Sequence, residues 1–176
     1  MHPAESKPAA GLAIEAPSSD VIVLTRELVD RAVLASRESP RKRMILRLHK
    51  TDDALFQRML NAMQPGTLFR AHRHLHPPKA ENFLVLRGRL RVVLFDERGG
   101  ITAHHDLVPG GETFGIDVEP GVCHTLACLE PDTVILECKQ GPYDPVSDKD
   151  FPAWAPGEDS PEAEAFLARL LALPAR

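Results

Sequence analysis

Basic residues are not in excess in this chain of 176 residues, and long apolar runs are missing. Lys and Arg together number 21 against 25 Asp and Glu, a formal net charge of −4. A nucleic-acid surface needs clustered positive charge, which this balance does not supply. No stretch approaches the ~20 apolar residues of a membrane-spanning helix. The sequence therefore predicts neither a nucleic-acid partner nor a membrane partner.

Cysteines and aromatic residues are also scarce. The three cysteines are Cys123, Cys128 and Cys138, and no C-x-x-C pair is present. An odd number of cysteines argues against a disulfide framework and favours reduced thiols in a cytoplasmic protein. The first 20 residues lack the basic and apolar regions of a signal peptide, which agrees with a cytoplasmic location. Aromatics make up 5% of the chain, so Leu, Val and Ile must fill most of the core.

The ends of the chain differ in character from its middle. Residues 1–19 contain three prolines with many Ala and Ser residues, a composition typical of a mobile tail. Thr25 can cap a helix that ends at Ser39-Pro40, because the residue before proline disfavours helical backbone. We expect one domain over residues 20–154, with this helix at its start.

A second helix is predicted over the C-terminal extension, residues 155–176. Ser160 can cap it, and Pro161 suits the first helical position. One apolar stripe follows at helical spacing: Ala163, Phe166, Leu167, Leu170 and Leu171. This stripe should pack on the main domain or on a second subunit.

Between residues 44 and 140 the pattern is that of strands. Short apolar runs such as FLVL, RLRVVLF and TVILECK are separated by turns rich in Gly, Pro and Asp. Many short strands at ~8–12-residue spacing indicate a β-sandwich or small barrel. No alternation of strands with helices is visible, which argues against a doubly wound sheet. The fold class is therefore mainly all-β.

Histidines and a glutamate gather around one turn of this region. His72 and His74 point to the same face of an extended chain, because strand side chains alternate. Pro77-Pro78 cannot continue a central strand, so the chain must turn and can bring Glu81 back beside the histidines. His124 follows a second turn at Pro120-Gly121. Neutral imidazole is the commonest protein ligand for transition metals.

The spacing of these residues resembles the two motifs of the cupin superfamily. Gly66, His72-x-His74, Glu81 and Gly88 are similar to the first motif, and PGVCH at 120–124 is similar to the second. The resemblance implies a double-stranded β-helix barrel, or jelly roll, with helices at both ends. It also implies one divalent metal ion (Fe, Mn, Ni or Zn) held by His72, His74, Glu81 and His124.

A closer resemblance, over about residues 24–154, is to the WbuC family of cupin-fold metalloproteins. SPRKRMILRLHKTDDALFQRML is similar to that family's segment before the first motif, and ECKQGPYDP followed by FPAW is similar to its ending. The genes of this family often lie among bacterial surface-polysaccharide genes. The resemblance therefore implies a small sugar-like or carboxylated ligand and a role in surface-polysaccharide metabolism.

The choice of ligands has one alternative. Six residues separate His74 from Glu81, whereas cupins usually have three or four there, and four separate His76 from Glu81. Pairing His74 with His76 would restore that gap. We choose His72 because His76 immediately precedes the turn, where backbone orientation is less fixed.

The sequence leaves the reaction open. The chain is either an enzyme, such as a metal-dependent isomerase, epimerase or oxygenase, or a non-enzymatic protein that binds or senses a small ligand. An enzyme that moves protons needs a titratable group besides the ligands, and His76, Glu112 and Tyr143 are the candidates. Cupin barrels commonly pair through sheet edges, so we expect a homodimer.

Other polar residues have a structural interpretation. His104 and His105 are predicted on the surface, His49 as a structural histidine with satisfied hydrogen bonds, and Glu137 with Lys139 as a solvent-facing pair. Arg70 shares the strand phase of His72 and is expected either at the mouth of the cavity or, more simply, with its guanidinium in solvent. Cys123 lies in the opposite phase to His124 and is not expected to be a ligand.

Overall fold

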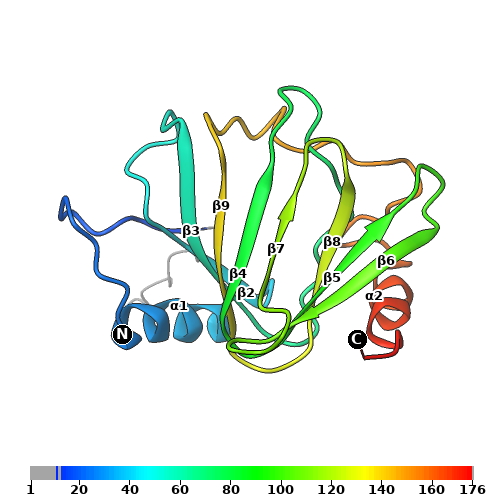
Figure 1. Cartoon of the computed structure of the whole chain (residues 1–176), viewed down its shortest axis with the longest axis horizontal. Coiled ribbons are helices and arrows are strands. Elements are labelled where there is room, and N and C mark those ends of the chain that lie inside the picture. Colours follow the sequence, from blue (N-terminus) through cyan, green and yellow to red (C-terminus); the bar gives the residue numbers. More distant parts are fainter. Residues whose placement is uncertain (1–10, 12, 176) are drawn as a thin grey trace, which may run out of the picture.

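The computed structural model describes residue 11 and residues 13–175, in which two sheets pack face to face (Figure 1). The larger sheet has the strand order β1-β2-β3-β9-β4-β7, and the smaller has the order β6-β5-β8. The strands are β1 (Ala13–Ile14), β2 (Arg43–Arg47), β3 (Phe56–Met63), β4 (Glu81–Arg87), β5 (Leu90–Phe95), β6 (Ile101–Leu107), β7 (Gly115–Val118), β8 (Cys123–Cys128) and β9 (Thr133–Gln140). Every pairing is antiparallel except that of β1 with β2. This confirms the cupin jelly-roll fold, mainly all-β with two helices.

Alternate side chains of the two sheets fill the space between them. Phe83 of β4 and Ile135 of β9 belong to the same buried cluster as Val92 of β5 and Leu126 of β8. Because strand side chains alternate, the neighbours of these residues point to the outer faces, where each sheet is covered by one helix. The space between the two sheets is therefore apolar around these four residues.

Helix α1 (Arg26–Glu38) covers the outer face of the larger sheet. The hydroxyl of Thr25 accepts a hydrogen bond from the backbone N–H of Leu28 at 3.2 Å, which confirms the predicted cap. Ala32 is buried against Leu46 and Leu60 of β2 and β3. The apolar face of this helix thus covers the part of the outer face that is formed by β2, β3 and β9.

Helix α2 (Ala163–Leu171) covers the outer face of the smaller sheet. Leu170 is completely buried in a cluster with Val93 and Phe95 of β5, so the predicted stripe packs on the barrel. The predicted cap is wrong: the backbone carbonyl of Ser160 closes a turn with Ala163 N, and its hydroxyl has no hydrogen-bond partner among the described residues. Pro161 therefore lies in this turn, before the helix begins.

The predicted tail at residues 1–19 is described only in part. Residues 1–10 and 12 lie outside the described residues, but Ala13–Ile14 forms β1 and pairs with Ile45 and Leu46 of β2. Lys50 Nζ also donates to the carbonyl of Ser19 at 2.7 Å. The second half of the predicted tail therefore differs from the prediction, because it adds an edge strand to the larger sheet. Neither of the two described helices is long and apolar enough to cross a membrane.

Candidate metal centre

Four polar side chains meet inside the barrel: His72, His74, Glu81 and His124. One nitrogen or oxygen atom from each lies within 4.8 Å of the corresponding atoms of the other three, and all four residues are buried. They are the four residues chosen from the sequence. His76, the alternative, is exposed in the turn at the proline pair.

Glu81 and His124 come from regular strands of opposite sheets. Glu81 is the first residue of β4 and shares its inner face with Phe83. His124 lies on β8, inward like Leu126, while Cys123 faces the cluster under α2. Burial raises the pKa of the Cys123 thiol to about 11, which disfavours the thiolate that a metal would need.

His72 and His74 lie on an extended segment that belongs to neither sheet. The backbones of His72 and His124 pair through two hydrogen bonds of 3.0 and 2.9 Å, and Arg73 pairs likewise with Asp150. The segment is thus held between β8 and the segment 141–156, which follows β9. Alternation is kept, so the two imidazoles share the inner side, as the sequence predicted.

The second ring nitrogen of each histidine fixes its tautomer. Nδ1 of His72 donates to the carbonyl of Arg70 at 2.9 Å, Nδ1 of His124 donates to Val122 O at 3.0 Å, and Nδ1 of His74 donates to the carbonyl of Asp148. A carbonyl oxygen only accepts, so each Nδ1 carries a proton and each Nε2 points inward; in a neutral ring this Nε2 has a free lone pair.

These lone pairs meet a carboxylate. The Nε2 atoms of His74 and His124 each lie 3.0 Å from an oxygen of Glu81. His74 Nε2 is buried, and its contact with Glu81 lacks hydrogen-bond geometry, so this atom is without a hydrogen-bond partner among the described residues. Facing lone pairs require a protonated ring or a cation between them. The arrangement of three Nε2 atoms and one carboxylate fits a divalent transition metal ion.

The electrostatics keep these groups in the forms that a metal binds. Burial, together with the positive charge of Lys149, holds the pKa of His72 well below its usual value, so the ring stays neutral. Burial alone would raise the pKa of Glu81. The contacts with His124 and His74 and the charge of Lys139 outweigh it and hold this pKa well below its usual value. A neutral imidazole and an ionised carboxylate are the ligand forms of these side chains.

A buried ionic network lies next to Glu81, and the sequence did not predict it. Lys139 Nζ is 3.5 Å from Glu81 Oε1 and 2.6 Å from Asp148 Oδ2, and Lys79 Nζ is 3.0 Å from Asp148 Oδ1. The two lysines and Asp148 are each buried. Burial lowers the pKa of Lys139, but the surrounding carboxylates outweigh this and raise it, so the ammonium stays charged.

Glu137 lies in a different place from the one predicted from the sequence. With Lys139 it was predicted to face solvent, yet it is 8% exposed and lies on the inner face of β9. The side-chain N–H of Asn61 donates to Glu137 Oε2 at 3.2 Å. Burial and the nearby charge of Glu81 raise the pKa of Glu137. In the sequence, the only sign of this inward position was that Glu137 has the same strand phase as the apolar Ile135.

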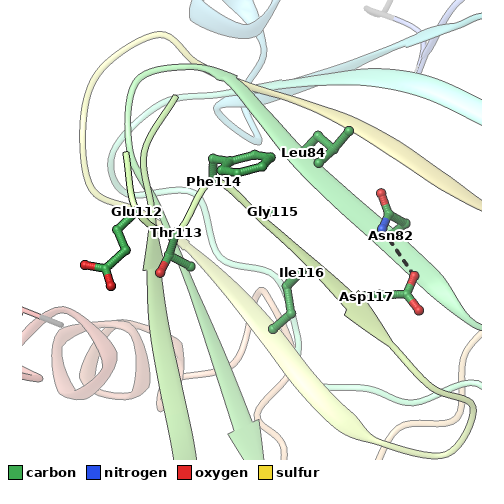
Figure 2. Close-up of a pocket in the computed structure, with 8 residues that line it drawn as sticks. All are labelled: Asn82, Leu84, Glu112, Thr113, Phe114, Gly115, Ile116 and Asp117. Atoms are coloured by element: carbon green, nitrogen blue, oxygen red, sulfur yellow. Dashed lines mark hydrogen bonds between the residues drawn. The ribbon is translucent and has the colours of Figure 1, made fainter. Parts of the chain in front are cut away.

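The acid–base groups predicted from the sequence are not part of the cluster. Glu112 lines a hollow on the outer side of β4 and β7, shown in Figure 2 with Leu84 and Phe114. Tyr143 is partly exposed, with its ring 6.0 Å from Lys139 Nζ. None of the three candidates predicted from the sequence, His76, Glu112 and Tyr143, is among the four residues of the cluster.

Two further histidines and an arginine have structural contacts. His104 was predicted on the surface, but it is 6% exposed and its Nε2 contacts Pro174 O at 2.9 Å, anchoring the chain after α2. The Nδ1 atom of His49 bonds to the backbone of Arg58, as expected of a structural histidine. The guanidinium of Arg70 lies 4.5 Å above the ring of Phe151, so it contacts the segment 141–156.

Comparisons with known proteins found one family model and several distant solved structures. Residues 24–107, just under half of the chain, match a family model described as a domain of unknown function (DUF6016). The model does not name the WbuC family, whose resemblance stays a prediction. No relative was found among curated proteins.

Three solved structures show how distant the relatives are. Capsular polysaccharide assembling protein CapF from Staphylococcus aureus is 22% identical over 60% of this chain and 28% of that chain, with a TM-score of 0.49. Oxalate decarboxylase from Bacillus subtilis is 24% identical over 52% and 22%, with a TM-score of 0.42. KdgF from Halomonas sp. is 18% identical over 59% and 80%, with a TM-score of 0.44. The chain spans less than a third of the first two, so their activities say nothing about this protein.

Proposed function

We propose that this chain is a metal-binding protein with a cupin fold, in which His72, His74, Glu81 and His124 hold one divalent ion. The observation that supports this is the convergence of three imidazole Nε2 atoms and one carboxylate in a buried cluster. Mixed nitrogen and oxygen ligands suit Fe, Mn, Ni or Zn. When bound, such an ion supplies positive charge that polarises a carbonyl or hydroxyl group at an open coordination position.

The charges around the cluster favour a small anionic ligand. Lys139 and Lys79 balance Glu81 and Asp148, so the charge of a divalent ion would be left without compensation in the barrel interior. Uncompensated buried charge is costly, and an anionic group at the open position relieves it. The exposed Lys149 adds positive charge near His72. These charges support a small sugar-like or carboxylated ligand, and the WbuC resemblance supports a role in bacterial surface-polysaccharide metabolism.

The second candidate is a non-enzymatic protein that binds or senses such a ligand. The two functions differ in their need for a proton-transferring group besides the ligands. Glu137 is a buried carboxyl group on the inner wall of the barrel that no proposed ligand set requires. Its position supports an enzyme over a passive binding protein.

Metal analysis of the purified protein tests this proposal. After removal of metal with a chelator, reloading with Mn²⁺, Fe²⁺, Ni²⁺ or Zn²⁺ should restore about one ion per chain and raise the unfolding temperature. A ligand at a hundredfold excess over its Kd should add about 2.7 kcal/mol of stability to the loaded protein. A protein that takes up none of these ions would refute the proposal.

A further inference from the structure

Asn61 carries an unpaired acceptor inside the barrel. Its side-chain N–H donates to Glu137, but its Oδ1 is buried and has no hydrogen-bond partner among the described residues. Asn61 is only 3% exposed. An unpaired buried acceptor costs about 1–3 kcal/mol. The position beside Glu137 is therefore suited to a group that donates a hydrogen bond, such as a ligand hydroxyl.

Glu137 and Glu81, one of the four proposed ligands, share one wall of the barrel. Across β4 and β9, Glu81 is opposite Lys139 and Phe83 is opposite Glu137. Glu137 is therefore the diagonal neighbour of Glu81 on the inner face, with Cβ atoms on the order of 7 Å apart. The ring of Phe83 also lies 6.0 Å from that of His124. A small molecule held at the cluster would be within reach of Glu137.

Charged groups face Glu137 from three directions. Glu81 lies on β4, Lys139 on β9 itself, and Lys149 on the segment that follows β9, while the neutral Asn61 faces it from β3. Burial and Glu81 raise the pKa of Glu137, and the two lysines oppose them. Glu137 is thus a second buried carboxyl group beside Glu81, outside the proposed ligand set.

We propose that Glu137 is the catalytic acid–base of this site, with Asn61 holding both Glu137 and a ligand hydroxyl, and that the ligands are small hydroxy-carbonyl compounds. The inference rests on the proposed metal-dependent function and names its reaction class. The Glu137 carboxylate takes the proton from the C–H bond beside the ligand carbonyl, and the electron pair of that bond moves toward the carbonyl oxygen. The proton of the adjacent hydroxyl passes to the former carbonyl oxygen, a new carbonyl forms at the carbon that carried this hydroxyl, and Glu137 returns its proton to the former carbonyl carbon. No electrons leave the ligand, so the net reaction is an isomerisation that needs no oxidant.

The first experiment measures proton release when Zn²⁺ binds to the metal-free protein. Calorimetry in buffers of different ionisation enthalpy, between pH 5 and 7, compares the natural protein with Glu137→Gln. Burial and the charge of Glu81 raise the pKa of Glu137, and bound Zn²⁺ offsets the charge of Glu81. The natural protein should therefore release more protons than the variant, by up to one per chain. Equal release at every pH, or loss of Zn²⁺ binding in Glu137→Gln, would overturn the proposal. A natural protein that binds no Zn²⁺ refutes the proposed function itself.

The second experiment follows exchange of ligand C–H protons with solvent. Metal-loaded protein is incubated in D₂O with dihydroxyacetone or D-fructose, and exchange is followed by proton NMR. Glu137→Gln should slow exchange by about 10²–10⁴-fold at unchanged metal content, and Asn61→Ala should slow it less. Glu112→Gln, on the outer side of the barrel, is the matched control and should behave as the natural protein. Exchange that persists in Glu137→Gln, or no exchange of any probe by the natural protein, would overturn the assignment.

Discussion

The ring Nδ1 of His74 donates a hydrogen bond to the backbone carbonyl of Asp148, although 74 residues separate them in the sequence. The carboxylate of Asp148 is held in turn by Lys79 and Lys139, at 3.0 and 2.6 Å. Asp148 therefore connects a proposed metal ligand to the buried lysines, one of which also contacts Glu81. Such supporting contacts orient ligands and tune metal affinity.

Replacement of the Asp148 carboxylate should weaken metal binding. In Asp148→Asn the two lysines lose their shared partner, so the carbonyl that orients His74 is held less firmly. We expect metal affinity to fall by about 10–100-fold, measured by competition with a chromophoric chelator. Asp144→Asn makes the same chemical change at an exposed position of the same segment and should keep the natural affinity. Equal affinities in the two variants would contradict this role of Asp148.

Because removal of the Asp148 carboxylate leaves buried Lys79 without a carboxylate and Lys139 with Glu81 alone, the single variant can also lose stability. The double variant Lys79→Met/Asp148→Asn removes one charge of each sign and keeps the pair of Lys139 with Glu81. Its metal affinity should still fall. Unfolding of the metal-free form, followed by circular dichroism, separates a loss of ligand orientation from a loss of fold.

Alanine at each proposed ligand should remove the metal. His72→Ala, His74→Ala, Glu81→Ala and His124→Ala each take one donor atom from the cluster. Metal content per chain, measured by elemental analysis after dialysis, should fall to a small fraction of the natural value. His76→Ala changes an exposed turn residue and should keep its metal. Loss of metal in His76→Ala with retention in His72→Ala would show that the other pair of histidines binds.

Stability should decrease in mild acid partly because of His49. Burial, with the charges of Arg47 and Arg58, lowers the pKa of His49 in the folded state. In the unfolded chain the ring takes up a proton near its ordinary pKa of about 6.5. The unfolded state therefore binds more protons below that pH, and stability falls until the lower pKa of the folded state is reached. Urea unfolding of the natural protein should show this loss between pH 7.5 and 5, and His49→Gln should show a smaller one. If the stability of the natural protein and of His49→Gln fell in parallel with pH, this role of His49 would be contradicted.

The contact of helix α2 with the barrel should contribute strongly to stability. Leu170 is completely buried, whereas its neighbour Leu171 is 41% exposed. Leu170→Ala should lower the free energy of unfolding by about 2–5 kcal/mol, because it removes buried methyl groups and leaves a cavity. Leu171→Ala should change it by less than about 0.5 kcal/mol. Similar losses in both variants, by urea denaturation, would show that the helix packs differently.

The homodimer stays a prediction, and β7 offers a surface for it. This strand ends the larger sheet, and Phe114 beside it is 53% exposed next to Leu84 (Figure 2). Unpaired edge strands with exposed apolar side chains tend to associate. Light scattering should give a mass near twice 19.4 kDa. Phe114→Glu should shift this mass toward the monomer, while Phe56→Glu, at an equally exposed position on β3, should not. A natural protein that scatters as a monomer would rule the dimer out.

The fold class could be predicted from the amino-acid sequence, and so could the four members of the cluster, with His76 as the alternative to His72. Strand length, turn residues and alternation are local properties, so the β character of residues 44–140 could be predicted. His72 and His74 share a face by alternation, and the turns before Glu81 and His124 restrict where the chain can return. The cap at Thr25 was predictable for the same reason, since it depends on three neighbouring residues.

The residues that surround the cluster could not be predicted from the sequence and became visible only in the folded structure. In β9 both strand faces carry apolar residues, because Val134 packs under α1 and Ile135 packs inside the barrel. Alternation therefore could not tell that Glu137 and Lys139 face inward. Asp148 and Asn61 reach the same interior from the segment after β9 and from β3, far apart in the sequence. Buried polar groups are tolerated only where such distant partners satisfy them, and those partners are set by the packing of the two sheets.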